Sequence, residues 1–441
     1  MVSPWRRLAR GLLAALGVAL LGALALPLAW ALTQGPDAEP RPLPPALQRP
    51  VAPAPSPVFE RLQGLEDGDA AAQGERLARS PLGCGRGEDC APRWQRETAA
   101  IADALAQAGE LGARCKAMAA LQREGQPYVE WLPPRLDPAT PLPRFAAPRH
   151  CQHWWIGQAL VAAAAGDDAD ARAQLQASRD WAVSSLAGAR SLIGHVIAYA
   201  QLQQHLQAVA ATALLQPGWA GVLEPLVQPW PEGLLRPDRW MPVEAAMARG
   251  AVDAADAACH ADETEALQPL PMDGVARWLC RHRLGWQPEA TRQRLDAQWQ
   301  ARAERAAAGP EAWLRASQAQ RAAPEAQAGA WSALAWRNTL GEWLVALVAD
   351  DRLFDGYVAR AADAELHRRM LAATLALRRD GVPPAGREAA WAAAGLPPDL
   401  LARTRWEPEG RALAWRSWSD GLGAPGAAAV VPTRIALDAG P

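Results

Sequence analysis

One uncharged stretch, residues 11–32, constrains the rest of the chain more than any other feature. It reads GLLAALGVALLGALALPLAWAL and contains no charged residue. A helix of this length extends about 33 Å, which matches a hydrocarbon core of about 30 Å. Arg6, Arg7 and Arg10 precede it, and positively charged flanks remain in the cytoplasm. We therefore predict a cytoplasmic segment at 1–10, a single inner-membrane helix at 11–32 and a periplasmic remainder.

A cleaved signal peptide is the alternative interpretation of the same stretch. Ala29-Trp30-Ala31 forms an A-x-A pattern, and the residues ahead of the apolar run are basic. An apolar run before a cleavage site is usually about 7–15 residues, shorter than this one, which favours an uncleaved anchor. Both interpretations place the same domain outside the cytoplasm.

The composition is that of an ordinary folded protein. Half of the 441 residues are hydrophobic and the net charge is −2, so neither disorder nor a nucleic-acid partner is indicated. Lys116 is the single lysine among 45 basic residues, and 21 tryptophans stand against three Phe and three Tyr. This bias follows GC-rich codons, so the number of tryptophans is poor evidence for a ligand platform.

Residues 33–57 are predicted to be a linker and residues 58–441 a helical domain. Positions 35–57 contain nine prolines, which favour extended polyproline II structure and exclude a core. At about 3.1 Å per residue, such a spacer would hold the domain up to about 70 Å from the membrane.

Six cysteines in an exported chain favour three disulfides over reactive thiols. They are Cys84, Cys90, Cys115, Cys151, Cys259 and Cys280. Fifteen pairings are possible, and we prefer nearest neighbours: 84 with 90, 115 with 151, and 259 with 280. The second bridge would close a proline-rich, aperiodic crossing at 126–149.

Helical periodicity covers most of the domain. We predict helices at 93–122, with a break near Gly109 or Gly112, and an antiparallel pair at 154–165 and 168–186. A helix at 191–215 is apolar on nearly every face and should be buried, as should the apolar stripe of a helix at 361–379. Further helices are expected at 243–259, 273–284, 288–308 and 387–394. The helix at 288–308 is charged on most faces and should be exposed.

The chain ends in a predicted β-hairpin at about 403–418. Alternation in residues 412–418 and the turn Pro408-Glu409-Gly410 indicate it, and residues 430–437 are a candidate third strand. The predicted fold is therefore mainly α, an irregular multi-helix bundle with one N-terminal transmembrane helix and a small C-terminal β-hairpin.

The Trp-rich segment 216–242 is the one place where carboxylate chemistry on a glycan is conceivable. It holds Glu232 and Asp238 among Trp219, Trp230 and Trp240. The favoured interpretation is that the tryptophans anchor an irregular segment on the helical core and that both acids are solvated. No phosphate-binding loop, G-x-S-x-G, H-E-x-x-H or C-x-x-C motif is present.

Metal and cofactor sites are not predicted. His150-Cys151-x-His153 with Cys280 and His282 lacks the usual zinc spacing, and the cysteines have better partners in each other. His195 and His205 lie about 80° apart around one helix, so they do not converge. We expect one to be a core histidine and the other a surface residue.

Several short motifs carry a resemblance. Asn338-x-x-Gly341, Leu344, Tyr357-x-x-Arg360-x-x-Asp363, RRMLAATLALRRDGVPP, LGCGRGEDCAPRW and SLIGHVIAYA are spread over the exported chain. Together they resemble a family of uncharacterised, membrane-anchored helical proteins of GC-rich Gram-negative bacteria, although Thr339 stands where that family usually has proline. The resemblance implies a single-span, periplasm-facing helical architecture, and it implies no activity, substrate or site residue.

Three functions remain open from the sequence. The first is a non-enzymatic, membrane-anchored module that presents a disulfide-linked helical domain to another envelope component. The second is an all-α cell-wall or glycan-active enzyme that uses the segment 216–242. The third is an envelope sensor or accessory subunit for a small molecule.

Overall fold

The fold is mainly helical, as predicted, with one small antiparallel sheet. The computed structural model describes residues 35–49, 54–65, 67–84, 88–260, 274–322, 337–349, 352–393, 398–407, 412–420 and 434–436. The predicted membrane helix at 11–32 and the segment 1–10 lie outside these residues. None of the helices in the described ranges is both long and apolar enough to cross a membrane.

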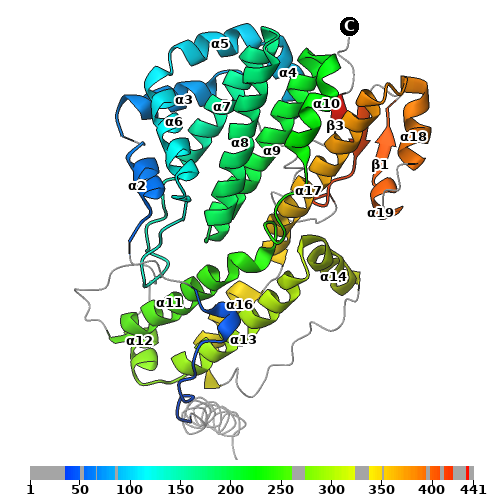
Figure 1. The fold of residues 1–441 in the computed structure, drawn as a ribbon. Coiled ribbons are helices and arrows are strands. Elements are labelled where there is room, and N and C mark those ends of the chain that lie inside the picture. The colour runs from blue at the N-terminus through cyan, green and yellow to red at the C-terminus, as the bar shows by residue number, and fades with distance from the viewer. Residues whose placement is uncertain are drawn as a thin grey trace, which may run out of the picture.

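Three successive helices form the centre of the molecule (Figure 1). They are α7 (Ala146–Ala164), α8 (Asp168–Gly188) and α9 (Leu192–Leu215). Gly166 takes a left-handed backbone with φ of 78°, and the Asp167 side chain accepts the Asp170 N–H at 3.0 Å to cap α8. The predicted antiparallel pair is therefore confirmed, with α7 starting earlier than expected.

Helix α9 is buried as predicted, although only its second half is covered all round. Ser191 caps it by accepting the Gly194 N–H at 2.9 Å. Ile193, in its first turn, is 41% exposed, because neighbouring helices do not reach that face. From Gln201 onward almost every side chain is inaccessible to solvent.

Shorter helices cover α7 and α9 on the N-terminal side of the molecule, with α4 on α9 and the others on α7. They are α2 (Pro57–Gly64), α3 (Asp69–Arg79), α4 (Ala91–Arg96), α5 (Thr98–Ala106) and α6 (Gly109–Arg123). The predicted break therefore falls just before Gly109, and a further break separates α4 from α5. The crossing between α6 and α7 has no helix, as expected, and forms its own small apolar contact between Leu132, Leu136 and Val243.

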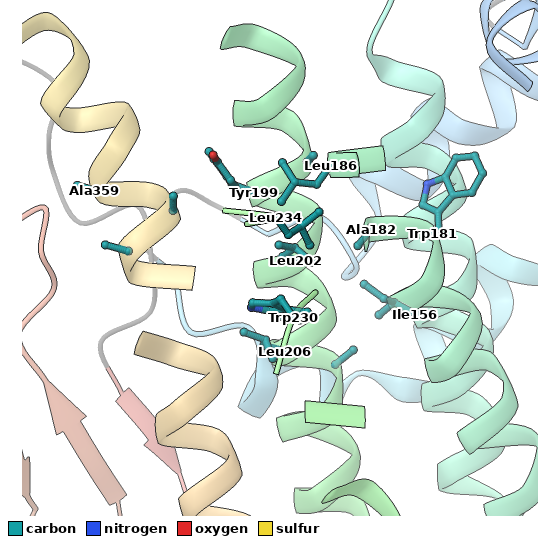
Figure 2. Close-up of a cluster of buried hydrophobic side chains, with 14 of the residues drawn as sticks. Ile156, Trp181, Ala182, Leu186, Tyr199, Leu202, Leu206, Trp230, Leu234 and Ala359 are labelled. Atoms are coloured by element: carbon teal, nitrogen blue, oxygen red, sulfur yellow. The ribbon is translucent and has the colours of Figure 1, made fainter. Parts of the chain in front are cut away.

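The Trp-rich segment after α9 folds into short turns that fill the core. They are η2 (Pro217–Trp219), α10 (Ala220–Leu223), η3 (Glu224–Val227) and η4 (Pro237–Arg239). Trp230 and Trp240 are 8% and 1% exposed. Figure 2 shows Trp230 and Leu234 beside Leu202 and Leu206 of α9. The prediction that these tryptophans anchor an irregular segment on the core is confirmed.

The next helices form the opposite end of the molecule, at the bottom of Figure 1. They are α11 (Met241–His260), α12 (Gly274–Arg281), α13 (Pro288–Ala307), α14 (Pro310–Ala322) and α16 (Thr339–Ala349). The prediction that the helix at 288–308 is exposed was wrong. Its residues Thr291, Leu295, Trp299 and Ala306 are buried, at intervals that place them on one face against α11, α14 and α16. Arginines lie between these positions in the sequence, so the buried face of the helix is not evident from the sequence.

The proline-rich segment also differs from its prediction. Residues 35–49, which we call the strap, lie against α13 and α11 and include the turn η1 (Pro45–Leu47). Leu47 is completely buried, and Asp37 accepts the N–H groups of Glu289 and Ala290 at 2.9 and 3.0 Å. The strap has no core of its own, but it packs against the core that the helices form. It is therefore part of the body and not a spacer.

The C-terminal part joins the longest helix to the sheet. It comprises α17 (Arg352–Arg379), η5 (Pro384–Gly386), α18 (Arg387–Ala393), α19 (Pro398–Leu401), β1 (Thr404–Trp406), β2 (Ala412–Trp415) and β3 (Arg434–Ala436). The hairpin and its third strand are confirmed in the order β1-β2-β3, with Leu413 opposite Trp406 and Ile435. All four residues of β2 are buried, so the alternation in the sequence does not mark one solvated face.

Three disulfides link neighbouring cysteines, in the pairing preferred from the sequence. Cys84 pairs with Cys90, Cys115 of α6 with Cys151 of α7, and Cys259 of α11 with Cys280 of α12. The Cα atoms of the last two pairs are 5.5 Å apart. The second bridge closes the extended crossing, and the third joins the two helices on either side of residues 261–273.

Candidate functional site

The predicted glycan-site acids do not converge. Glu232 is exposed and lines a cleft of about 370 Å³ between residues 229–236, the start of α14 and α17. Asp238 does not line it, because its carboxylate accepts from the Arg236 Nε at 3.0 Å.

The remaining acids of this cleft are paired with arginines. Glu311 lies 3.7 Å from Arg315, and Glu365 lies 2.8 Å from Arg369. Burial by itself would raise the pKa of Glu365, but hydrogen bonds from Arg368 and Arg369 outweigh it and hold the pKa below its usual value. A glycosidase general acid needs the opposite shift. Glu365 is therefore suited to an ion pair and not to proton donation.

The histidine and cysteine cluster is structural as well. Cys151 and Cys280 are in disulfides, so neither is available as a thiolate ligand. His150 Nε2 lies 3.5 Å from Glu75, and the buried ring of His153 contacts Gln204 at 3.1 Å. Burial lowers the pKa of His153 to about 3. These side chains therefore do not form the zinc site considered from the sequence.

The expectation that one of His195 and His205 is a surface residue was wrong. Both are completely buried. His205 lies between the Ser178 hydroxyl at 3.3 Å and the Leu226 carbonyl at 3.1 Å, because α8 and η3 cover that face of α9. Burial lowers the pKa of His205 to about 4 and that of His195 to about 3. They are neutral core residues.

A second cleft, of about 420 Å³, has a positively charged lining. Three arginines line it: Arg49 from the end of the strap, Arg190 from the turn between α8 and α9, and Arg239 from η4. Tyr128 and Gly188 belong to the same wall, and none of the described residues that line the cleft is acidic. We call it the arginine cleft.

Two guanidinium groups of the arginine cleft are held by backbone carbonyls. Arg239 donates to the carbonyls of Leu234 and Ala187 at 3.2 and 2.6 Å, and Arg49 donates to that of Pro133 at 2.6 Å. Burial lowers the pKa of both groups, and the charge of Arg190 lowers the pKa of Arg49 further. Arg49 and Arg190 thus repel each other, and a carboxylate or phosphate would relieve that repulsion.

Two acids near the cleft, Glu130 and Glu244, are committed to the start of α9. Buried Glu130 accepts the N–H groups of Arg190 and Ser191 at 2.6 and 2.9 Å, and Glu244 accepts that of Leu192 at 3.0 Å. These bonds satisfy donors that a helix N-terminus leaves unpaired. Burial raises the pKa of Glu244 despite its hydrogen bond. Both carboxylates therefore serve the helix end beneath the cleft.

Sequence reasoning missed the arginine cleft. Its three arginines come from positions 49, 190 and 239, and in a chain with 45 basic residues none of them stands out. The available signal was Glu130, the one charged residue in the apolar run 127–134, but its partners could not be named without the fold.

The motif residues behind the family resemblance bind other parts of the fold. Asn338 accepts the Gln287 N–H at 2.9 Å and donates to Thr291 at 2.8 Å, which joins α16 to α13. Asp363 of α17 accepts from the Ser417 hydroxyl at 2.9 Å and the Trp418 N–H at 2.6 Å, which joins α17 to the C-terminal segment. Comparisons with protein-family models, curated proteins and solved structures found no match to this chain.

Proposed function

We propose that this chain is a non-enzymatic, membrane-anchored envelope protein whose helical body binds an acidic segment of a partner protein in the arginine cleft. The observation that carries this proposal is the convergence of Arg49, Arg190 and Arg239 on one cleft with no acidic residue in its described lining. Arginine recognises carboxylates through paired, directional hydrogen bonds. A volume of about 420 Å³ admits one or two side chains.

Two further features support a binding role in the envelope. The uncharged stretch 11–32 after Arg6, Arg7 and Arg10 has the length of a membrane helix. Three disulfides suit an oxidising compartment, and the Cys115–Cys151 bridge closes the crossing that contributes Tyr128 to the wall of the cleft. A preformed site reduces the entropy lost on binding.

The binding role can be tested with the full-length chain in lipid nanodiscs. An acetylated, amidated peptide rich in Asp and Glu should bind in calorimetry, whereas the same peptide with Asn and Gln should not. Arg190→Gln and Arg49→Gln should each weaken binding about tenfold or more, since each removes a charge-assisted contact worth about 1.5–3 kcal/mol. Arg79→Gln removes one charge from α3, outside the cleft, and should leave affinity unchanged.

Two outcomes would redirect the proposal. Equal binding of the acidic and neutral peptides would contradict an arginine-based site. Binding of free succinate with no binding of the acidic peptide would favour the small-molecule sensor instead.

The glycan-enzyme alternative rests on Glu232. Glu232→Ala and Asp238→Ala should leave stability and cellular phenotype nearly unchanged, because Glu232 is exposed and Asp238 pairs with Arg236. Loss of phenotype in either variant at normal protein level would move the assignment to an enzyme.

A further inference from the structure

The strap is bound to the body from the first described residue. The Gly35 carbonyl accepts from Gln287 Nε2 at 3.1 Å, and two residues later Asp37 caps the N-terminus of α13. A Cβ built on Gly35 would lie 3.4 Å from the guanidinium of Arg337, just ahead of α16. The chain is thus fixed to the α13 and α16 end of the molecule at residue 35.

This attachment sets how far the body can stand from the membrane, given the membrane anchor of the proposed function. Only Thr33 and Gln34 separate Gly35 from Leu32, the last residue of the apolar stretch. Three extended steps cover at most about 11 Å. The headgroup layer of one leaflet is about 5–8 Å thick. Gly35 must therefore lie in that layer or immediately beside it.

The surface around Gly35 carries exposed tryptophans. Trp343 of α16 is 52% exposed and Trp278 of α12 is 55% exposed. Trp343 is connected to the strap through Gly285: the Leu340 N–H, one turn before Trp343, donates to the Gly285 carbonyl at 3.0 Å, and Gln287, two residues after Gly285, donates to the Gly35 carbonyl. Trp278 precedes Gly285 by seven residues, and the Leu284 N–H donates to the Leu279 carbonyl at 2.8 Å, so this connection is compact. Figure 1 shows α11, α12, α13 and α16 gathered at this end, away from α5 and α18.

We propose that this end of the body, marked by Gly35, Trp278 and Trp343, rests in the headgroup layer of the phospholipid bilayer. Tryptophan favours that layer, because its ring is amphipathic and its indole N–H finds a polar partner there. The other large exposed hydrophobic side chains among the described residues are aliphatic: Leu142, Ile193 and Leu353. The body therefore lies on the membrane, and the strap fixes it there next to the anchor.

The test uses full-length chain in phosphatidylcholine and phosphatidylglycerol nanodiscs. With the six native cysteines oxidised, one added cysteine at a time is spin-labelled: Pro36→Cys, Trp278→Cys, Trp343→Cys or, as a control on α3, Arg79→Cys. Collision rates with oxygen, which concentrates in lipid, and with a soluble nickel complex are then compared. Labels at 36, 278 and 343 should show an oxygen-to-nickel ratio several-fold above that at 79. The label at 36 reports the end of the anchor, and because Trp278 and Trp343 are more than half exposed, their replacement should leave the core intact.

The outcomes separate this inference from the membrane anchor. A raised ratio at 36 with water-like ratios at 278 and 343, like that at 79, in chain that remains with the nanodiscs would overturn the inference and leave the anchor intact. Chain that does not enter nanodiscs at all would overturn both.

Discussion

Gly250 lies where α11 meets the α6–α7 crossing, and a side chain does not fit there. A Cβ at this position would lie 1.7 Å from the Leu136 carbonyl oxygen. We expect Gly250→Ala to lower the free energy of unfolding by about 1–3 kcal/mol, because the backbone must shift. Gly356→Ala in α17 is the matched control: its Cβ meets nothing within 4 Å, and it should stabilise by about 0.5–1 kcal/mol. Urea unfolding with equal effects for both variants would contradict this account.

His205 should make the fold sensitive to acid. Its pKa falls to about 4 in the folded chain through burial, against about 6.5 when unfolded. Between these values the unfolded chain binds more protons, so the stability that His205 contributes is present above pH 6.5 and is lost as the pH falls toward 4. The difference in unfolding free energy between wild type and His205→Gln should therefore narrow by about 1.4 kcal/mol per pH unit. A difference that is the same at pH 8 and pH 4.5 would exclude this linkage.

At the level of elements, removing the Cys115–Cys151 disulfide between α6 and α7 should lower the free energy of unfolding more than removing the Cys84–Cys90 disulfide. Cys115 and Cys151 are separated by 36 positions, and Cys84 and Cys90 by 6. In the chain-entropy account a longer closed loop restricts the unfolded state more. Replacing Cys115 and Cys151 by Ala should cost about 2–5 kcal/mol, and replacing Cys84 and Cys90 should cost less. Denaturant unfolding of the two double variants tests which of them has the lower free energy of unfolding.

The strap supplies a helix cap from a distant part of the chain. Asp37→Ala should destabilise the protein by about 0.5–2 kcal/mol and speed hydrogen exchange at the Glu289 and Ala290 amides, which lose their acceptor. Glu39→Ala is the control, because its exposed side chain can be removed while its backbone carbonyl still accepts from Gln293. Unchanged exchange in Asp37→Ala would mean that the strap does not hold α13.

At the level of the whole molecule, one core extends from the strap to the sheet. The same cluster of buried side chains contains Leu47, Leu206, Leu371 and Ile435. We expect Leu371→Ala to cost about 2–5 kcal/mol and to leave a single transition, because the cavity lies within a continuous core. Tryptophan fluorescence and far-ultraviolet circular dichroism should report the same midpoint. Separate midpoints would indicate two independent units.

The local pattern of the sequence predicted most elements. Helical periodicity placed α7, α8, α9 and α17, glycine and proline marked their ends, and the alternating C-terminal segment marked the sheet. These features depend on residues a few positions apart, so they can be read directly. The buried tryptophans of segment 216–242 were also foreseen, because a long irregular segment requires apolar anchors.

Only the tertiary structure decided which surfaces are covered and which distant residues meet. It buried one face of the charged helix α13, enclosed His205 beneath η3, and turned the expected spacer into the strap. It also brought Arg49, Arg190 and Arg239 to one cleft. The physical reason is that burial and charge proximity are properties of the surroundings of a residue, and the sequence by itself determines only its immediate neighbours along the chain.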